Sequence, residues 1–173
     1  PEWLISDIAI MNAGGITVPL FTTYSEDDYK YILNDCQPRV CIVSNYDKLK
    51  KIKNFTKENT IVISIDEFDQ KINSFKNIFF KERTDLKTIA ESVVPYNNKL
   101  KRNDLACIIY TSGTTGNPKG VMLSHGGILS NCEGAREILN SLVEKNLPVF
   151  LTWLPLSHSY EHTVQYVQIS LGA

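Results

Sequence analysis

Residues 110–121 read Tyr-Thr-Ser-Gly-Thr-Thr-Gly-Asn-Pro-Lys-Gly-Val and follow directly on an apolar run, Leu105–Tyr110, that predicts a buried strand. The glycines allow backbone N–H groups to turn toward one point, and the hydroxyl side chains add further donors. Lys119 supplies a positive charge for phosphate, and Pro118 limits the freedom of the loop. A loop of this kind after a buried strand predicts a cradle for a polyphosphate.

This loop differs from two other phosphate-binding loops. The P-loop pattern G-x-x-x-x-G-K-[ST] requires a second glycine where Pro118 stands, five residues after Gly113, and a hydroxyl residue where Gly120 follows the lysine. The pattern G-x-G-x-x-G is also absent from these residues. The alternative is a turn that is rich in Gly and Thr without a function, but the strand and the fixed spacing T-S-G-T-T-G-x-P-K-G favour a cradle.

Toward the amino terminus, amphipathic helices alternate with short apolar strands. Ser25 and Asp28 form a capping signal, and Pro38 ends the helix that follows them. The alternation is typical of an α/β fold with a mainly parallel sheet, and this is the fold class that we predict. The expected helices cover Glu2–Ala13, Ser25–Pro38 and Tyr46–Lys53, and the expected strands cover Ile16–Phe21, Val40–Val43 and Ile61–Ile65.

The stretch Asp66–Lys101 is less regular than the rest of the chain. Its four phenylalanines predict an excursion over the surface, with a helix near Leu86–Val93 and a turn or linker at Pro95–Asn98. After the loop, the pattern becomes clear again. The expected elements are a short apolar run at Val121–Leu123, a helix over His125–Leu139, a strand over Val149–Leu154 and a final helix from near Ser157.

The composition excludes several classes of function. The 18 basic residues nearly balance the 19 acidic ones, so the chain lacks the electrostatic footprint of a nucleic-acid-binding protein. The four cysteines form no C-x-x-C pair and lie among apolar residues, which predicts buried, reduced thiols in a cytosolic protein. No apolar stretch approaches the ~20 residues needed to span a bilayer, and no signal-peptide pattern opens the chain.

At this point the sequence resembles a known family. Thr111–Val121 is similar to the phosphate-loop signature of the AMP-forming adenylating enzymes, which include acyl-CoA synthetases, luciferases and the adenylation domains of peptide synthetases. The resemblance covers nearly the whole chain and is weakest at Asp66–Lys101. Within the family, the segments that resemble long-chain acyl-CoA synthetases are Pro1–Ile10 with Gly14–Leu20, Tyr31–Val40, and Leu154–Glu161, which looks like the motif P-L-x-H-x-x-E.

The resemblance implies both a fold and a reaction. The fold is the layered helix–sheet–helix N-terminal domain of these enzymes, in which residues 1–103 are the first α/β portion and residues 104–173 are the phosphate-loop portion, truncated at its end. The reaction begins when a fatty acid carboxylate attacks the α-phosphate of ATP to give an acyl-adenylate and pyrophosphate. The acyl group then passes to the thiol of coenzyme A, and Mg²⁺ assists the phosphate chemistry.

The resemblance also implies roles for individual residues. The cradle for the β- and γ-phosphates consists of Ser112, Gly113, Thr114, Thr115 and Gly116, with Lys119 neutralising charge and the hydroxyl of Thr111 near Mg²⁺. His158 is expected beside the acyl pocket, where an imidazole can donate to a carboxylate or phosphate oxygen. The alternative for His158 is a structural hydrogen bond at the start of a helix. Glu161 and His125 are expected to be structural, and Tyr96 and Trp153 to be packing residues.

A second pattern competes for the same histidine. The run from His158 to His162 matches H-x-x-E-H, which predicts a zinc hydrolase. Only eleven residues remain after His162 to supply a third ligand, Pro155 and Leu156 match the synthetase motif, and a zinc site leaves the phosphate loop unexplained. We therefore rank the zinc hydrolase last. An adenylate-forming enzyme for an aryl, medium-chain or aminoacyl substrate stands above it, as does a non-catalytic nucleotide-binding module.

The resemblance further predicts that this chain is incomplete. Downstream, the family has a Y-G-x-T-E segment, an aspartate for the ribose and a small mobile domain with a catalytic lysine, and none of these precedes Ala173. The chain also begins without Met and ends within an apolar helical pattern. We therefore expect this chain to be an inactive fragment whose partner is the missing C-terminal portion of the same enzyme. We expect the enzyme in the cytoplasm, either free or in peripheral contact with a membrane.

Overall fold

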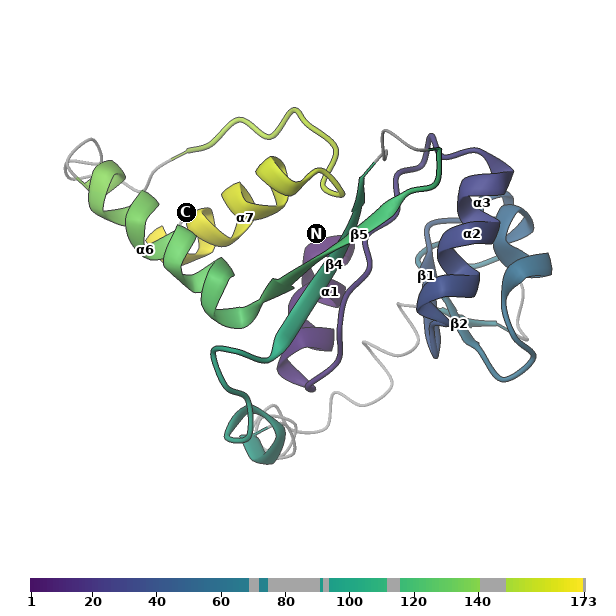
Figure 1. The fold of residues 1–173 in the computed structure, drawn as a ribbon, viewed down its shortest axis with the longest axis horizontal. Coiled ribbons are helices and arrows are strands. Elements are labelled where there is room, and N and C mark those ends of the chain that lie inside the picture. The colour runs from purple at the N-terminus through teal and green to yellow at the C-terminus, as the bar shows by residue number, and fades with distance from the viewer. Residues whose placement is uncertain (69–71, 75–90, 92–93, 112–115, 141–148, 173) are drawn as a thin grey trace.

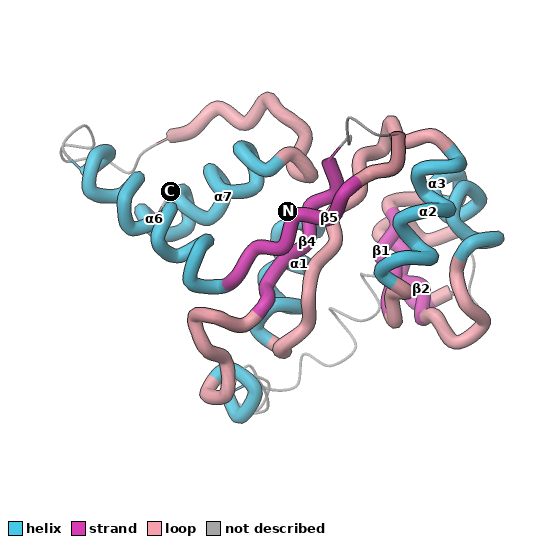
Figure 2. The backbone as a smooth tube through the Cα atoms, viewed as in Figure 1, coloured by secondary structure: helices cyan, strands magenta, loops and turns pink. Residues whose placement is uncertain are grey.

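The computed structural model describes residues 1–68, 72–74, 91, 94–111, 116–140 and 149–172, and Figures 1 and 2 show their arrangement. The helices are α1 (Glu2–Asn12), α2 (Glu26–Cys36), α3 (Tyr46–Ile52), α6 (His125–Asn140) and α7 (Ser159–Leu171), with a 3₁₀ turn, η1, at Lys53–Phe55. The strands are β1 (Val40–Val43), β2 (Ile61–Ser64), β3 (Asn73–Ser74), β4 (Leu105–Thr111) and β5 (Lys119–Ser124).

The first α/β unit is a three-stranded parallel sheet in the order β1-β2-β3, as the alternation of helices and strands predicts. Helix α2 begins with the expected capping box, in which Ser25 Oγ accepts from the Asp28 N–H at 3.2 Å and the Ser25 N–H donates to Asp28 Oδ2 at 3.0 Å. It ends before Pro38, where Gln37 takes a left-handed φ of 43°. The core of this unit consists of Tyr29, Leu33, Cys41, Val43, Leu49 and Ile52.

Strands β4 and β5 form a separate antiparallel hairpin, so the expectation of a mainly parallel sheet holds only for the first unit. The physical reason is the short connection between β4 and β5, because a parallel crossover requires a dozen or more residues. Figure 1 shows this hairpin between the α6–α7 pair and the unit that contains α2 and β1. The residues at the two ends of the loop between β4 and β5 therefore lie near elements from the first and last parts of the chain.

The strand predicted at Ile16–Phe21 is wrong except at one residue. Thr17 makes an isolated parallel bridge to β4, in which its N–H donates to Ala106 O at 3.0 Å and its carbonyl accepts from the Ile108 N–H at 2.9 Å. Pro19 lacks an amide proton and cannot continue such a ladder. The segment instead runs along β4 and leads to α2.

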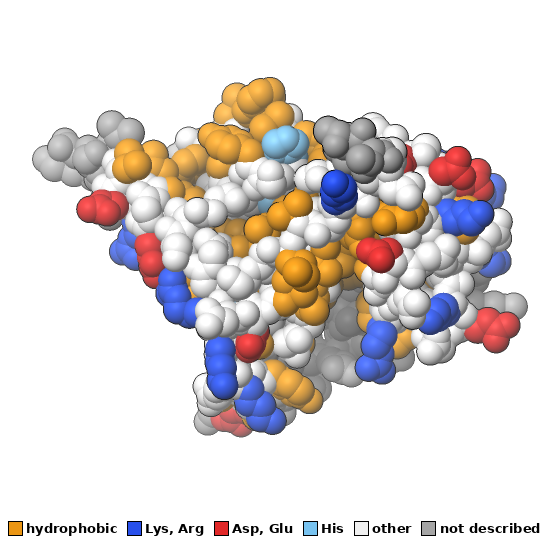
Figure 3. Space-filling view, in the orientation of Figure 1, with side chains coloured by type: hydrophobic (Ala, Val, Ile, Leu, Met, Phe, Trp, Pro, Cys, Tyr) orange, Lys and Arg blue, Asp and Glu red, His pale blue; other side chains and the backbone are white. Residues whose placement is uncertain are grey.

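The strand predicted at Val149–Leu154 is also wrong. Those residues have no strand conformation, and among the described residues no strand pairs with them. Val149 is 98% exposed, Leu151 85% and Trp153 73%, so the apolar run that suggested a strand has no sheet to join here, and Trp153 is not a packing residue. In Figure 3, hydrophobic side chains gather at the top of the molecule, where Figure 1 shows the segment that leads into α7.

In the irregular stretch, the turn predicted at Pro95–Asn98 is largely a helical turn, since residues 94–97 are helical. Proline is tolerated in the first turn of a helix, where its missing N–H has no partner to lose. Tyr96 is exposed there and is not a packing residue. The helix expected near Leu86–Val93 lies outside the described residues except for Glu91, which is helical, and of the four phenylalanines only Phe68 is described, packed against the first core.

The four cysteines are free thiols, three of them buried and Cys36 half-buried. Burial raises the pKa of Cys36, Cys41 and Cys107 to about 11. The expectation of buried thiols is confirmed for Cys41, Cys107 and Cys132, whereas Cys36 is only half-buried. Within the described part of the chain, none of the helices combines the length and apolar character that a membrane span needs.

Candidate functional site

The two ends of the predicted phosphate loop face each other across the mouth of the hairpin. Thr111, the last residue of β4, pairs in register with Lys119, the first residue of β5, and Thr111 Oγ1 lies 3.5 Å from the Lys119 carbonyl oxygen. Both side chains are exposed. Two of the residues to which the resemblance assigns nucleotide roles are therefore neighbours at the start and end of the loop.

The middle of the loop is only partly described. Ser112, Gly113, Thr114 and Thr115 lie outside the described residues. Gly116 has a φ of 101°, and a Cβ atom built there meets nothing within 4 Å, so the glycine is required by its backbone conformation and not by crowding.

The base of the loop is held by Tyr110, which is 2% exposed. Its hydroxyl donates to Asp35 Oδ2 at 2.5 Å, and its carbonyl oxygen accepts from the Tyr24 hydroxyl at 2.9 Å. Burial, together with the negative charge of Asp35, raises the pKa of Tyr110, so its hydroxyl stays protonated and remains a donor. Residues from three separate segments thus meet at the entrance to the loop.

Sequence reasoning did not find Tyr24 and Asp35. They lie 86 and 75 residues from Tyr110 along the chain, so no local spacing connects them. The only available signal was Asp35 itself, an acidic residue in the last turn of a helix that has no basic residue there. An acidic group at that end opposes the helix dipole, which indicates a role other than helix stability.

His158 is the N-cap residue of α7, and its Nδ1 accepts from the Tyr160 N–H at 3.3 Å. A structural hydrogen bond at the start of the helix, one of the two roles expected for this histidine, is therefore present. Because Nδ1 is used in the cap, Nε2 is the ring nitrogen through which the exposed side chain can reach a ligand. Capping and ligand contact are compatible at this position.

An aromatic segment connects His158 with the base of the loop. The Phe21 ring lies edge-on to the His158 ring at 6.5 Å between centroids and edge-on to the Tyr24 ring at 5.3 Å. Tyr24 then donates its hydroxyl to the Tyr110 carbonyl. The segment that precedes α2 therefore brings the start of α7 to the same side of the hairpin as the loop.

The second histidine of the H-x-x-E-H pattern has a different environment. His162 is 2% exposed and its Nε2 lies 2.9 Å from Asp7 Oδ2 on α1, while the Tyr166 hydroxyl donates to the same oxygen. Glu161 is buried and accepts from Gln165 Nε2 at 2.9 Å, as expected for a structural residue. Within the described residues, no three His, Cys, Asp or Glu side chains gather in a way that could hold a metal ion.

The class of protein follows from comparison with known proteins. Residues 1–173 match the family of AMP-binding enzymes, and the chain belongs to that family. Its α/β fold is that of the N-terminal domain of adenylate-forming enzymes, here with small and incomplete sheets.

The particular relatives are ligases for fatty acids. The chain is 30% identical to fatty acyl-CoA synthetase A of Dictyostelium discoideum over 99% of this chain and 26% of that protein. It is 33% identical to long-chain-fatty-acid–CoA ligase 5 of Rattus norvegicus, again over 99% of this chain and 26% of that protein. A solved structure from Rhodopseudomonas palustris with a long-chain-fatty-acid CoA ligase assignment has a TM-score of 0.75 and 18% identity, covering 99% of this chain and 40% of that one.

The chain thus spans about a quarter of the length of the curated relatives that it matches.

Proposed function

We propose that this chain is the phosphate-loop part of a long-chain fatty acid–CoA ligase, which activates a fatty acid with ATP and transfers the acyl group to coenzyme A. The observation that carries the proposal is the pairing of Thr111 with Lys119 across the mouth of a glycine-rich turn. The names of the relatives support fatty acids as the acyl substrates. The cytoplasm as location, with or without contact to a membrane surface, remains part of this proposal.

The chemical difficulty of the first step is repulsion between two anions. A carboxylate must approach the α-phosphate of ATP, and the repulsion between them grows as water leaves the site. Lys119 offers a positive charge at the end of the loop, and a positive charge beside the phosphates offsets this repulsion. We propose that Lys119 and the loop hold the β- and γ-phosphates and favour the departure of pyrophosphate.

Magnesium fits the residues at the mouth of the loop. The Thr111 side chain is exposed, and its hydroxyl makes only a long contact of 3.5 Å to the Lys119 carbonyl, so an oxygen ligand is accessible there. Mg²⁺ prefers oxygen ligands and usually binds substrate phosphates with few protein groups. When bound, it would offset phosphate charge and help to orient the leaving pyrophosphate.

His158 has a supporting part in this proposal. Its position as N-cap fixes the backbone at the start of α7, and its Nε2 is the ring nitrogen left to donate to a carboxylate or phosphate oxygen. We propose that it orients the fatty acid carboxylate or the acyl-adenylate. A residue that only caps the helix would affect stability but not the use of the acid substrate.

The proposal is tested with Lys119→Ala in the full-length enzyme that contains this chain. The two half-reactions are measured separately, as pyrophosphate exchange into ATP with a long-chain fatty acid and as acyl transfer from preformed acyl-adenylate to coenzyme A. We expect adenylate formation to slow by about 10²-fold or more, because one charge-stabilising donor is lost, and acyl transfer to slow much less. Equal slowing of both steps would contradict the assignment of Lys119.

The competing functions are distinguished by the same assays. An aryl, medium-chain or aminoacyl ligase would exchange pyrophosphate with those acids and not with long-chain ones. A non-catalytic nucleotide-binding module would bind ATP without exchange with any acid.

A further inference from the structure

The entrance to the phosphate loop is attached to a helix that belongs to the other α/β unit. Tyr110 precedes Thr111 and the loop, and its hydroxyl crosses from the hairpin to Asp35 on α2. Its backbone carbonyl is held by Tyr24 in the segment just before the same helix. The side chain and the backbone of one residue are therefore both anchored to the α2 region.

The Tyr110 ring has little freedom in the hairpin. A Cβ atom at Gly120, its register partner on β5, would lie 2.9 Å from Ile108 Cγ2 and 3.3 Å from Tyr110 Cζ. Glycine at that position therefore lets the ring lie close against β5 while its hydroxyl reaches α2. The hydroxyl thereby connects α2 to the end of β4, which carries Thr111.

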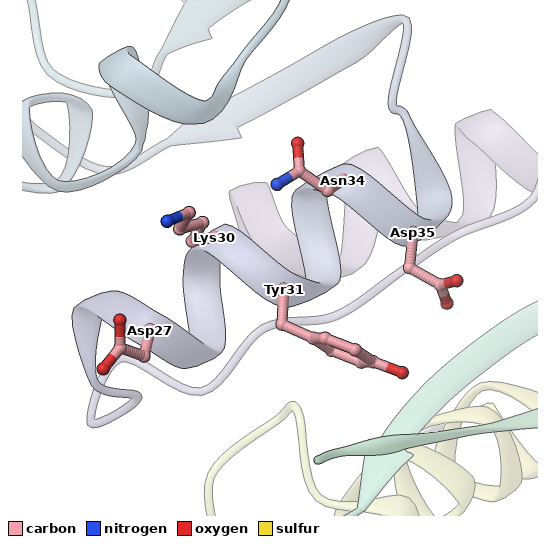
Figure 4. A pocket seen from close by; sticks show the side chains of 5 residues that line it. All are labelled: Asp27, Lys30, Tyr31, Asn34 and Asp35. Carbon is pink, nitrogen blue, oxygen red and sulfur yellow. The ribbon is translucent and has the colours of Figure 1, made fainter.

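Helix α2 is a firm support for this contact. The capping box fixes its first turn, and Tyr29 and Leu33 bury its inner side in the core of the first unit. Figure 4 shows Tyr31 and Asp35 on the side of α2 that faces the hairpin, beside a shallow cavity of about 440 Å³. Asp35 is exposed there, so the contact with Tyr110 is not a consequence of core packing.

From these contacts we propose that Asp35 is a positioning residue for the phosphate loop, acting through the Tyr110 hydroxyl. This inference rests on the proposed function, because the loop is taken to hold the triphosphate of ATP. The carboxylate accepts the tyrosine hydrogen bond and so sets the direction in which β4 delivers Thr111. Donors in such a site stabilise phosphate charge only when they are held in position before ATP binds.

The experiment uses Asp35→Ala and Tyr110→Phe, singly and together, in the full-length enzyme that contains this chain. The Michaelis constants for ATP and for a long-chain fatty acid are measured by pyrophosphate exchange, and ATP affinity is measured directly by calorimetry. We expect each single change to raise the KM and Kd for ATP about three- to tenfold, as for the loss of one charge-assisted hydrogen bond. The KM for the fatty acid should change less than about twofold.

The double variant separates positioning from general damage. Both changes remove the same hydrogen bond, so the double variant should match the single ones and not show the product of their effects. Asp35→Asn, which keeps an acceptor oxygen, should restore a KM for ATP close to that of the wild type. Asn34→Ala is the matched control, because Asn34 is the neighbouring exposed residue that lines the same cavity.

Several outcomes would overturn the inference. An unchanged KM and Kd for ATP in Asp35→Ala would do so, as would multiplicative effects in the double variant or an equal rise in both Michaelis constants. A wild-type enzyme that binds ATP but exchanges no pyrophosphate would contradict the proposed function alone, and the calorimetric comparison would still decide the role of Asp35. A wild-type enzyme that does not bind ATP would overturn both.

Discussion

Two aspartates in this protein accept hydrogen bonds from tyrosine hydroxyls, but their surroundings differ. Asp35 contacts Tyr110 at the exposed edge of α2, beside the phosphate loop. Asp7 contacts Tyr166 between α1 and α7 and is 5% exposed. The same pair of groups therefore connects elements that are distant in sequence in two places, once through an exposed carboxylate and once through a buried one.

The two contacts differ in what surrounds the remaining groups after one hydrogen-bond partner is removed. When the Tyr110 hydroxyl is removed, water can take its place at the exposed Asp35 carboxylate, so the loss is close to the net value of one hydrogen bond. At Asp7, the carboxylate, His162 Nε2 and the Tyr166 hydroxyl all contact one another inside the protein, so removing one group leaves the other two buried with one partner fewer and no water to replace it. We infer that the buried cluster mainly stabilises the fold and that the exposed contact mainly positions the site.

The largest effect is expected from Asp7→Ala. Loss of the shared acceptor leaves His162 and the Tyr166 hydroxyl with only each other as partners in the interior, and losing buried hydrogen bonds in this way typically costs about 1–3 kcal/mol. Urea unfolding of the full-length enzyme, followed by a signal from this domain, measures the change. Glu58→Ala, which removes an exposed carboxylate from the same chain, is the control and should alter stability by less than about 0.5 kcal/mol. A small effect of Asp7→Ala would show that the cluster is not a stabilising unit.

A second test uses alkaline pH. Burial raises the pKa of Tyr166 above its ordinary value, and the charge of Asp7 raises it further. Between the unfolded value of about 10 and the raised folded value, the unfolded chain loses this proton while the folded chain keeps it. Stability from this group is therefore fully present below pH 10 and falls as the pH rises, by up to about 1.4 kcal/mol per pH unit.

The variant Tyr166→Phe shows how much of the pH dependence of the free energy of unfolding comes from Tyr166. Free energies of unfolding are compared between about pH 9 and 11 for the wild type and the variant. The variant should be less stable at pH 9 and should lose stability less steeply above pH 10. Parallel curves for the two proteins would contradict the assignment.

The smallest effect is expected from Tyr110→Phe on stability. The ring remains in place and the Asp35 carboxylate is open to water, so the free energy of unfolding should fall by less than about 1 kcal/mol. Tyr166→Phe measured in the same buffer at neutral pH should lose more. If Tyr110→Phe proves the more destabilising change, the distinction between a stabilising cluster and a positioning contact fails.

Local patterns in the sequence were sufficient for elements whose signals lie within a few residues. The capping pair Ser25 and Asp28 begins α2 as predicted, and the apolar runs at Val40–Val43 and Leu105–Tyr110 are strands. The resemblance to adenylate-forming enzymes, carried largely by Thr111–Val121, led to the correct family. These signals are reliable because cap geometry, helical spacing and loop chemistry depend on adjacent residues.

Predictions that required a partner strand failed in two places. The run Val149–Leu154 has the composition of a strand, but within the described residues no strand lies beside it. At Ile16–Phe21 a neighbour exists in β4, yet Pro19 limits the pairing to Thr17. A strand is stable only when another strand satisfies its backbone groups, and composition alone does not reveal whether one is present.

The sequence by itself determined the family, and it predicts where a phosphate loop lies and which residues carry its charge and hydroxyl groups, because all of these follow from residues adjacent in the chain. Only the tertiary structure decided how that loop is supported. Asp35 with Tyr110, and Asp7 with His162, are separated by 75 and 155 residues, and such contacts come from packing of whole helices and strands. The residue types of the candidate site thus follow from a short stretch of sequence. Their support in space depends on contacts between residues that are far apart in the chain, which no short pattern predicts.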